Sequence, residues 1–197
     1  MFQLRNLQFG DVINSYKRHL PFYDIPAHLI RWHQRRKWDG ANYKSTHSVL
    51  YLEGGVFFEV TAPRARFGNI NEFTNESHYT VCRYRDANIS TIPEREKDYF
   101  RETCWEYDST KYDYFQLVDI GIKGILDWCP EYLPIFDLGR RRKVCSVMVV
   151  IAYLNWWEAV KGERNLRRPL GEQHAEVAAP ADFENHPTFK NLGELII

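Results

Sequence analysis

Cys145 is the residue of this sequence best placed to do chemistry. It follows four consecutive basic residues at 140–143 and begins an apolar run of helical length that extends to residue 152. A helix N-terminus and neighbouring cations both favour the thiolate, the form of cysteine that attacks a carbonyl carbon. The position therefore indicates a nucleophile. It also fits a second interpretation, a small buried core residue, because most unpaired cysteines are of that kind.

His47 and Glu59 supply the other two residue types that a cysteine hydrolase needs, a base and a polar group that orients it. Both lie in a predicted β-hairpin over residues 46–61. If the loop takes the three residues 53–55, Val49 lies opposite Glu59, and His47 and Glu59 share one face of the sheet. A two-residue loop would put them on opposite faces. The hairpin register therefore decides whether a triad can form.

Further segments predict the elements around this hairpin. They are a strand from about Asp11, a helix from Asp24 to near Gly40, a strand over 79–84, a charged helix from Ile92 to about Trp105, a helical segment over 111–125, the Cys145 helix ending near Ala159 before Gly162, and one helical turn at 180–184. The sequence contains no internal repeat and no low-complexity linker.

Bulk composition narrows the class of protein. A chain of 197 residues with 26 basic and 26 acidic residues favours one domain and gives no global signal for nucleic acid or an anionic membrane. The four cysteines, at 82, 104, 129 and 145, lack the Cys-x-x-Cys spacing of a zinc ribbon or a dithiol redox pair. No secretory signal and no transmembrane run is present, so we expect a cytoplasmic protein, with delivery by a signal-independent route left open.

The remaining histidines and basic residues favour structural roles. His19, His28 and His33 share no helical face, so no metal ion and no cofactor are expected. A basic group at 31–37 with Trp32 and Trp38 fits a solvated helix face better than a phosphate-binding surface. No nucleic-acid partner is expected.

Five short motifs occur in an order that resembles the circularly permuted papain-like branch of the NlpC/P60 superfamily, and in appearance most of all its YiiX-like permuted amidase family. The motifs are Gly10-Asp11-Val12-Ile13, then residues 45–51 with Gly54-Gly55 and Glu59, then Lys111-Tyr112-Asp113-Tyr114, then Val144-Cys145-Ser146, and Pro180-Ala181-Asp182. In the permuted group the histidine strand precedes the cysteine helix, as it does here. The similarity extends from about Leu4 to Asp182.

This resemblance implies roles for individual residues. Cys145 matches the family's nucleophile, His47 its base, and Glu59 the residue that orients the base. The oxyanion donors would be the Cys145 amide together with Tyr112 or Tyr114. The sequence departs from the family pattern at positions 46 and 147, where Thr and Val stand in place of a common Ser and a frequent Glu.

The resemblance also implies an architecture and an activity. We expect an α+β, permuted papain-like (NlpC/P60) fold, in which a small antiparallel sheet or partly open barrel packs on the Cys-bearing helix. It would form a single domain over 1–197, with a core over about 4–162 and a loop-like tail over 163–197. The implied activity is cleavage of a peptide, peptidoglycan-type or N-acyl amide bond, with a small amide, peptide or acylated substrate as partner. Alternatives are a thiol-dependent acyltransferase or lipid-modifying enzyme, as in the lecithin:retinol acyltransferase branch, and a catalytically inert binding module.

Overall fold

The structure is a computed structural model, and it describes residues 2–19, 22, 24–38, 43–85, 93–113, 144–162 and 178–197. These residues form a mixed α+β fold. The strands are β1 (Phe2–Gln3), β2 (Val12–Lys17), β3 (His47–Glu53), β4 (Val56–Val60), β5 (Ala65–Asn69), β6 (Ser77–Tyr84) and β7 (Phe189–Ile196). The helices are α1 (Ile25–Lys37), α2 (Glu94–Tyr107), α4 (Cys145–Lys161) and α5 (Pro180–Asn185), with short 3-10 turns at Leu4–Asn6 and Ile70–Glu72.

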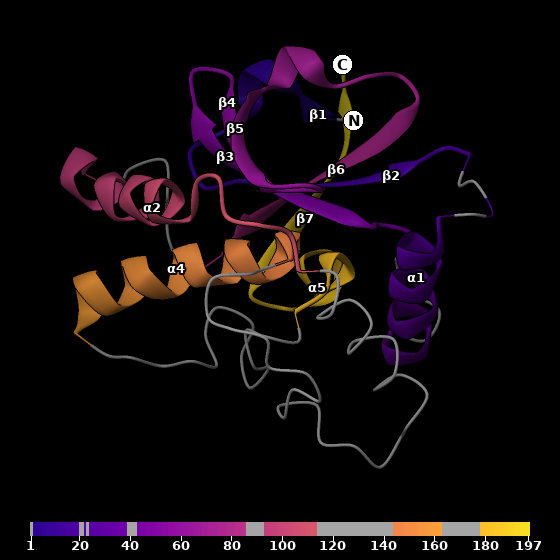
Figure 1. Cartoon of the computed structure of the whole chain (residues 1–197). Helices are drawn as coiled ribbons and strands as arrows, with labels where there is room; N and C mark the ends of the chain where they lie inside the picture. The colour runs from indigo at the N-terminus through magenta and orange to yellow at the C-terminus, as the bar shows by residue number, and fades with distance from the viewer. Residues whose placement is uncertain are drawn as a thin grey trace.

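The strands join into one open sheet of seven strands, in the order β1-β7-β6-β2-β3-β4-β5. Neighbouring strands are antiparallel except β1 and β7, which are parallel. The sheet is strongly curved, so that β3, β4 and β5 turn over toward β6 (Figure 1). The expected α+β class and largely antiparallel sheet are confirmed at this level.

The β3–β4 hairpin has the register that brings His47 and Glu59 to one face. Val49 lies opposite Glu59 and Tyr51 opposite Phe57, with an irregularity between Tyr51 and Glu53. The two glycines of the loop have φ values of 61° and 83°, and Glu53 has a φ of 113°. Positive φ is the conformation that glycine adopts without steric cost, which explains why two glycines stand at this turn.

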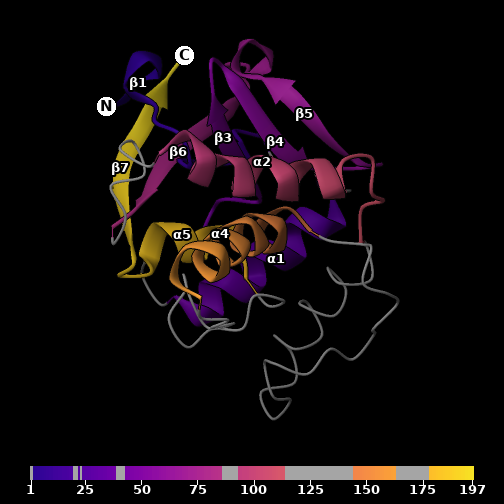
Figure 2. The ribbon, with the colours of Figure 1, turned by 90° about the vertical axis from the view of Figure 1, so that its left-hand side faces the viewer.

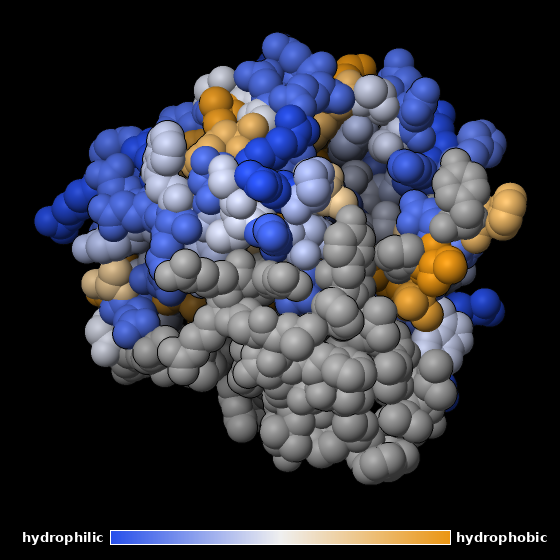
Figure 3. Space-filling model, viewed as in Figure 1, coloured by the Kyte–Doolittle hydropathy of each residue, from blue (hydrophilic) through white to orange (hydrophobic). Residues whose placement is uncertain are grey.

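Helices α2 and α4 cover one face of the sheet, with α5 beside them (Figure 2). Side chains that alternate along the strands, among them Leu50, Phe58 and Cys82, pack there against α4 residues such as Met148 and Tyr153. Burial of apolar area at about 25 cal/mol per Å² is the main contribution to holding α4 in place. The outward side of α2 carries ion pairs such as Arg101 with Glu94, and the surface over this helix is mainly hydrophilic (Figure 3).

The opposite, concave face of the sheet holds a second, smaller core. It is formed by alternate residues of the same strands, including Ile13, Val49, Phe57 and Val81. His47 and Glu59 follow the same alternation, since each stands two residues from a member of this core. The concave face is therefore the face on which the two polar side chains meet.

Two of the sequence predictions are wrong for the described residues. The predicted loop-like tail is wrong for its described part, because Phe189–Ile196 forms β7 between β1 and β6. Its apolar residues Phe189, Leu192 and Leu195 are three positions apart, so the sequence lacks the alternation that predicts a strand. The predicted helical segment is wrong at its start, because Lys111 forms an isolated bridge with Arg64; the rest of it, from Tyr114, lies outside the described residues.

A buried ion pair fixes the start of β2. The carboxylate of Asp11 is fully buried and accepts hydrogen bonds from Nε of Arg83 at 2.7 Å and Nη2 at 2.8 Å. Removing one partner of such a pair leaves the other charge uncompensated. We expect Asp11→Ala to lower the free energy of unfolding by about 3 kcal/mol in a urea titration followed by circular dichroism.

The matched control is Asp98→Ala. Asp98 is exposed and pairs with Arg101 at 2.9 Å on the surface of α2, so its loss is expected to cost less than about 1 kcal/mol. Equal losses of stability for the two variants would contradict the role given to the Asp11 pair.

Candidate active site

Cys145 is the first residue of α4, and the fold holds this helix end tightly. The hydroxyl of Ser146 donates a hydrogen bond of 2.6 Å to the carbonyl oxygen of Ala178. Val144 and Val147 pack against Ile30 of α1. Cys145 itself is only 3% exposed, and the backbone N–H of Ser48 donates to its sulfur, so the thiol lies at the N-terminal end of α4 beside the start of β3.

His47 reaches this thiol from the first position of β3. Its Nε2 lies 2.7 Å from Oε2 of Glu59, and its side chain is hydrogen-bonded to Cys145. Because Glu59 occupies Nε2, Nδ1 is the ring nitrogen left for the thiol. The structure thus brings together the three side chains that the sequence singled out.

The charges of these groups support one another. Burial alone would lower the pKa of His47, but the charge and hydrogen bond of Cys145, with those of Glu59, raise it to about 10. Burial alone would raise the pKa of Cys145, but the charge and hydrogen bond of His47 lower it below its ordinary value. The favoured state is therefore a thiolate beside an imidazolium ion.

Two backbone amides add to this effect. The N–H groups of Ser48 and Ser146 donate to the Cys145 sulfur and lower its pKa further. Ser146 N–H belongs to the first turn of α4, where amide groups have no acceptor within the helix. The basic run at 140–143, which the sequence suggested as a further source of positive charge, lies outside the described residues.

A polar network behind β3 holds Ser48 in place. Its hydroxyl donates to Oδ1 of Asn14 at 2.7 Å, and Nδ2 of Asn14 donates to Oε1 of Glu184 at 3.0 Å. The hydroxyl of Ser45 donates to the same glutamate oxygen. Sequence analysis gave these residues no role in the site, because the segments that carry them, around residues 14, 45–48 and 184, are distant along the chain.

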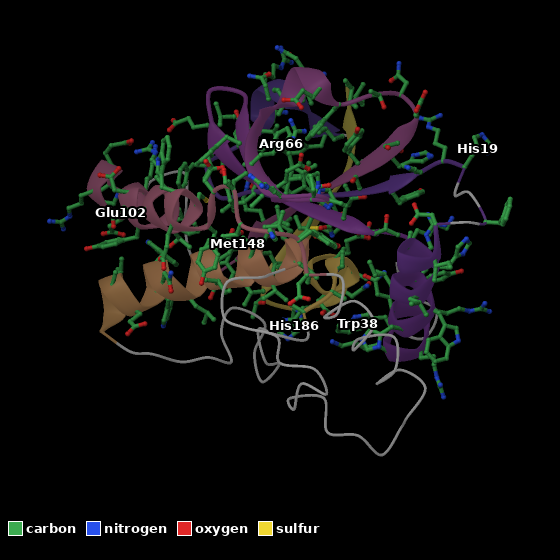
Figure 4. All side chains as sticks on the ribbon, viewed as in Figure 1. His19, Trp38, Arg66, Glu102, Met148 and His186 are labelled. Atoms are coloured by element: carbon green, nitrogen blue, oxygen red, sulfur yellow. The ribbon has the colours of Figure 1, made fainter. Side chains whose placement is uncertain are left out.

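Arg66 is a further residue that sequence analysis missed. It lies directly opposite Glu59 in the β4–β5 pair, and its Nε and Nη2 contact Oε1 of Glu59 at 2.8 Å and 2.7 Å. Its Nη2 also contacts Glu72 at 2.8 Å. Figure 4 shows Arg66 above the sheet and Met148 on α4 beneath it. Opposite charges at facing positions of two strands could have identified Arg66 as the partner of Glu59. The sequence did not predict β5, so this pairing was not recognised.

Arg66 keeps Glu59 ionised. Burial raises the pKa of Glu59, but His47 and Arg66 together lower it below the ordinary value. We expect Arg66→Met to weaken the Glu59–His47 contact and to slow alkylation of Cys145 by iodoacetamide at pH 6 by roughly 3- to 10-fold, the effect of half to one pKa unit. The acidic limb of the alkylation rate should move to higher pH, and Arg66→Lys should restore part of the rate.

Arg64→Met is the matched control for this prediction. Arg64 is exposed, lies two positions from Arg66 and is not a neighbour of Glu59, so its loss should leave the pH profile unchanged. The role assigned to Arg66 would be lost if Arg66→Met followed the wild-type profile.

Of the two tyrosines expected as oxyanion donors, one lies within the described residues. Tyr112 is partly buried against Val144 and Val147 at the start of α4. Tyr114 lies outside the described residues.

Among the described residues, no group of three or more His, Cys, Asp or Glu side chains is arranged to hold a metal ion.

Comparison with solved structures places this arrangement in a known fold. The chain superposes on metalloprotein yiiX from Escherichia coli O157:H7 with a TM-score of 0.54, over 95% of this chain and 97% of that chain. The chain has the fold of yiiX. At 14% sequence identity, the likeness to yiiX concerns the fold alone.

Comparison of the sequence with protein families and with curated proteins found no match. No protein-family model matches the chain, and no curated protein sequence matches it. Within the described part, no helix is both long and apolar enough to cross a membrane.

Proposed function

We propose that this protein is a cysteine hydrolase with a permuted papain-like fold that cleaves an amide bond through an acyl-thioester. The observation that carries the proposal is the continuous chain of contacts from Cys145 through His47 to Glu59, with the pKa of the thiol lowered and that of the imidazole raised. The order of histidine strand before cysteine helix agrees with the permuted arrangement.

Acylation follows from this geometry. The thiolate of Cys145 attacks the carbonyl carbon and forms a C–S bond, which places negative charge on the carbonyl oxygen. Amide N–H groups at the start of α4, that of Cys145 among them, are the donors for this oxyanion. The C–N bond then breaks, and the imidazolium of His47 gives its proton to the leaving amine.

Deacylation reverses the roles of His47. Neutral His47 takes a proton from water as the water oxygen attacks the thioester carbonyl. The C–S bond breaks, the acid product leaves, and the thiolate and imidazolium are restored. Glu59 stays ionised throughout and keeps the imidazole oriented, because Arg66 holds its other oxygen.

A metal ion does not fit the described residues of this site. yiiX is described as a metalloprotein, but here the Glu59 carboxylate is already bound to Nε2 of His47 through one oxygen and to Arg66 through the other. At most two donors remain for a metal ion, the sulfur of Cys145 and Nδ1 of His47. A bound transition metal usually takes three or more ligands from the protein. No step is therefore assigned to a metal.

The direct test is to trap the acyl-enzyme. The protein is incubated with a mixed pool of peptide amides, N-acyl amino acids and acyl esters, quenched in acid and weighed intact. We expect an added acyl mass that maps to Cys145 and is released by neutral hydroxylamine, as thioesters are. Its absence from wild-type protein across the pool, or its persistence in Cys145→Ala, would overturn the proposal. Transfer of the acyl group to an added amine instead of water would identify an acyltransferase.

A further inference from the structure

The concave face of the sheet contains a pocket beside His47. Its volume is about 180 Å³, several times the roughly 30 Å³ that one water molecule occupies. Five of its lining residues are apolar or aromatic: Ile13, Val49, Phe57, Phe73 and Tyr79. The space suits one aliphatic or aromatic side chain.

The apolar wall is held rigidly. Phe73 stacks on Phe57 with ring centroids 5.2 Å apart and on Tyr79 at 4.4 Å. Ile13 and Val49 are buried in the core beneath. A pocket whose walls are already packed loses little entropy when a ligand enters it.

The pocket is also lined by polar residues, which include His47 and Glu59 of the catalytic group. The others are Ser15, Arg66 and Glu72. Arg66 contacts the two glutamates through Nε and Nη2, and Nη1 is the guanidinium nitrogen that these contacts do not involve. Arg66 is 49% exposed, so a ligand in the pocket can reach it.

We infer that this pocket binds the residue on the amine side of the cleaved amide, and that this residue is apolar. The inference rests on the proposed function. His47 gives its proton to the leaving nitrogen, so the group attached to that nitrogen lies beside His47, which lines the pocket. The acyl group stays on the sulfur of Cys145, which does not line it. Arg66 Nη1 then donates to the carbonyl or carboxylate oxygen of the same residue. The substrate class is a peptide or N-acyl amino acid with a residue such as leucine or phenylalanine at this position.

The test uses alkylating reagents that carry an amino acid. N-iodoacetyl derivatives of glycine, leucine, phenylalanine and glutamate are compared on wild-type protein, each rate divided by that with free cysteine. At about 0.8 kcal/mol per buried methylene, we expect leucine and phenylalanine to react roughly 10- to 100-fold faster than glycine, and glutamate to show no such gain. This series does not depend on the folding of any variant.

Filling the pocket should remove the preference. Ser15 lines the pocket and lies between His47 and Tyr79 on neighbouring strands. In Ser15→Phe the ratio of the leucine rate to the glycine rate should fall to about 1. Lys17→Phe is the matched control, because Lys17 is exposed, lies two positions along the same strand and is not part of the pocket; it should keep the wild-type ratio.

The outcomes separate this inference from the proposed function. Rapid alkylation of Cys145 by every reagent with equal rates for glycine and leucine would overturn the pocket assignment and leave the thiolate intact. A leucine preference that survives in Ser15→Phe would also overturn it. Slow alkylation of Cys145 by all reagents, including iodoacetamide, would overturn both.

Discussion

Replacing Cys145 by alanine is expected to remove the acyl-enzyme and to lower the hydrolysis rate by roughly 10⁴-fold or more, as loss of a catalytic nucleophile does in comparable hydrolases. No described cysteine can substitute for it. Burial raises the pKa of Cys82 and of Cys104 above the ordinary value, so both stay protonated and unreactive. The measurement is turnover of any substrate that acylates the wild-type protein.

Peptide mapping of wild-type protein after brief exposure to iodoacetamide at pH 6.5 provides the companion measurement. Cys145 should be modified well before Cys82 and Cys104, because its pKa alone among the three is lowered. Cys104→Ala is the control and should retain both the labelling of Cys145 and the hydrolysis rate. Labelling of Cys145 no faster than that of the other two would contradict the assignment of the nucleophile.

Replacing His47 by alanine is expected to slow alkylation of Cys145 at pH 6.5 by roughly 100-fold, the effect of two pKa units. The variant keeps the burial that raises the pKa of the thiol but loses the positive charge that lowers it. Its rate should therefore rise with pH and approach the wild-type rate only in alkaline solution. A wild-type rate at pH 6.5 would remove His47 as the partner of Cys145.

The pH dependence of hydrolysis by the wild-type protein tests whether His47 acts as a charged imidazolium. The imidazole has a pKa of about 10, so it is charged below that pH and neutral above it. Hydrolysis should decline as the pH rises through about 10, because the leaving amine loses its proton donor. Alkylation should not decline, because it needs only the thiolate. His78→Ala is the control: His78 pairs with Glu194 at 2.7 Å, away from the catalytic group, and its loss should leave both profiles unchanged.

Much of the local structure follows from the sequence. Asp24 caps α1 by accepting the N–H of Ala27 at 3.3 Å, and Gly162 ends α4 with a φ of 66°, as the positions of these residues predicted. The hairpin was also predictable, because two short apolar runs, 49–52 and 56–58, flank two glycines. β5 and β7 were missed. Both strands contain a glycine, which is uncommon in strands. They form because neighbouring strands of the sheet pair with them, and that pairing is not visible in the local sequence.

The sequence by itself determined which residue types are present for a thiol hydrolase and which local elements carry them. Cys145 at the start of an apolar helix and His47 and Glu59 in one hairpin were evident from spacing alone. Their order along the chain resembles that of the permuted papain-like family.

Only the tertiary structure decided whether these side chains meet. The Val49–Glu59 register puts His47 and Glu59 on one face, and packing of α4 on β3 brings the thiol to the imidazole. Arg66 and the pocket beside His47 also depend on strand pairing between residues that no local pattern connects. The physical reason is that pKa values, hydrogen bonds and cavities arise from distances across the sheet, and those distances are set by burial of the whole core.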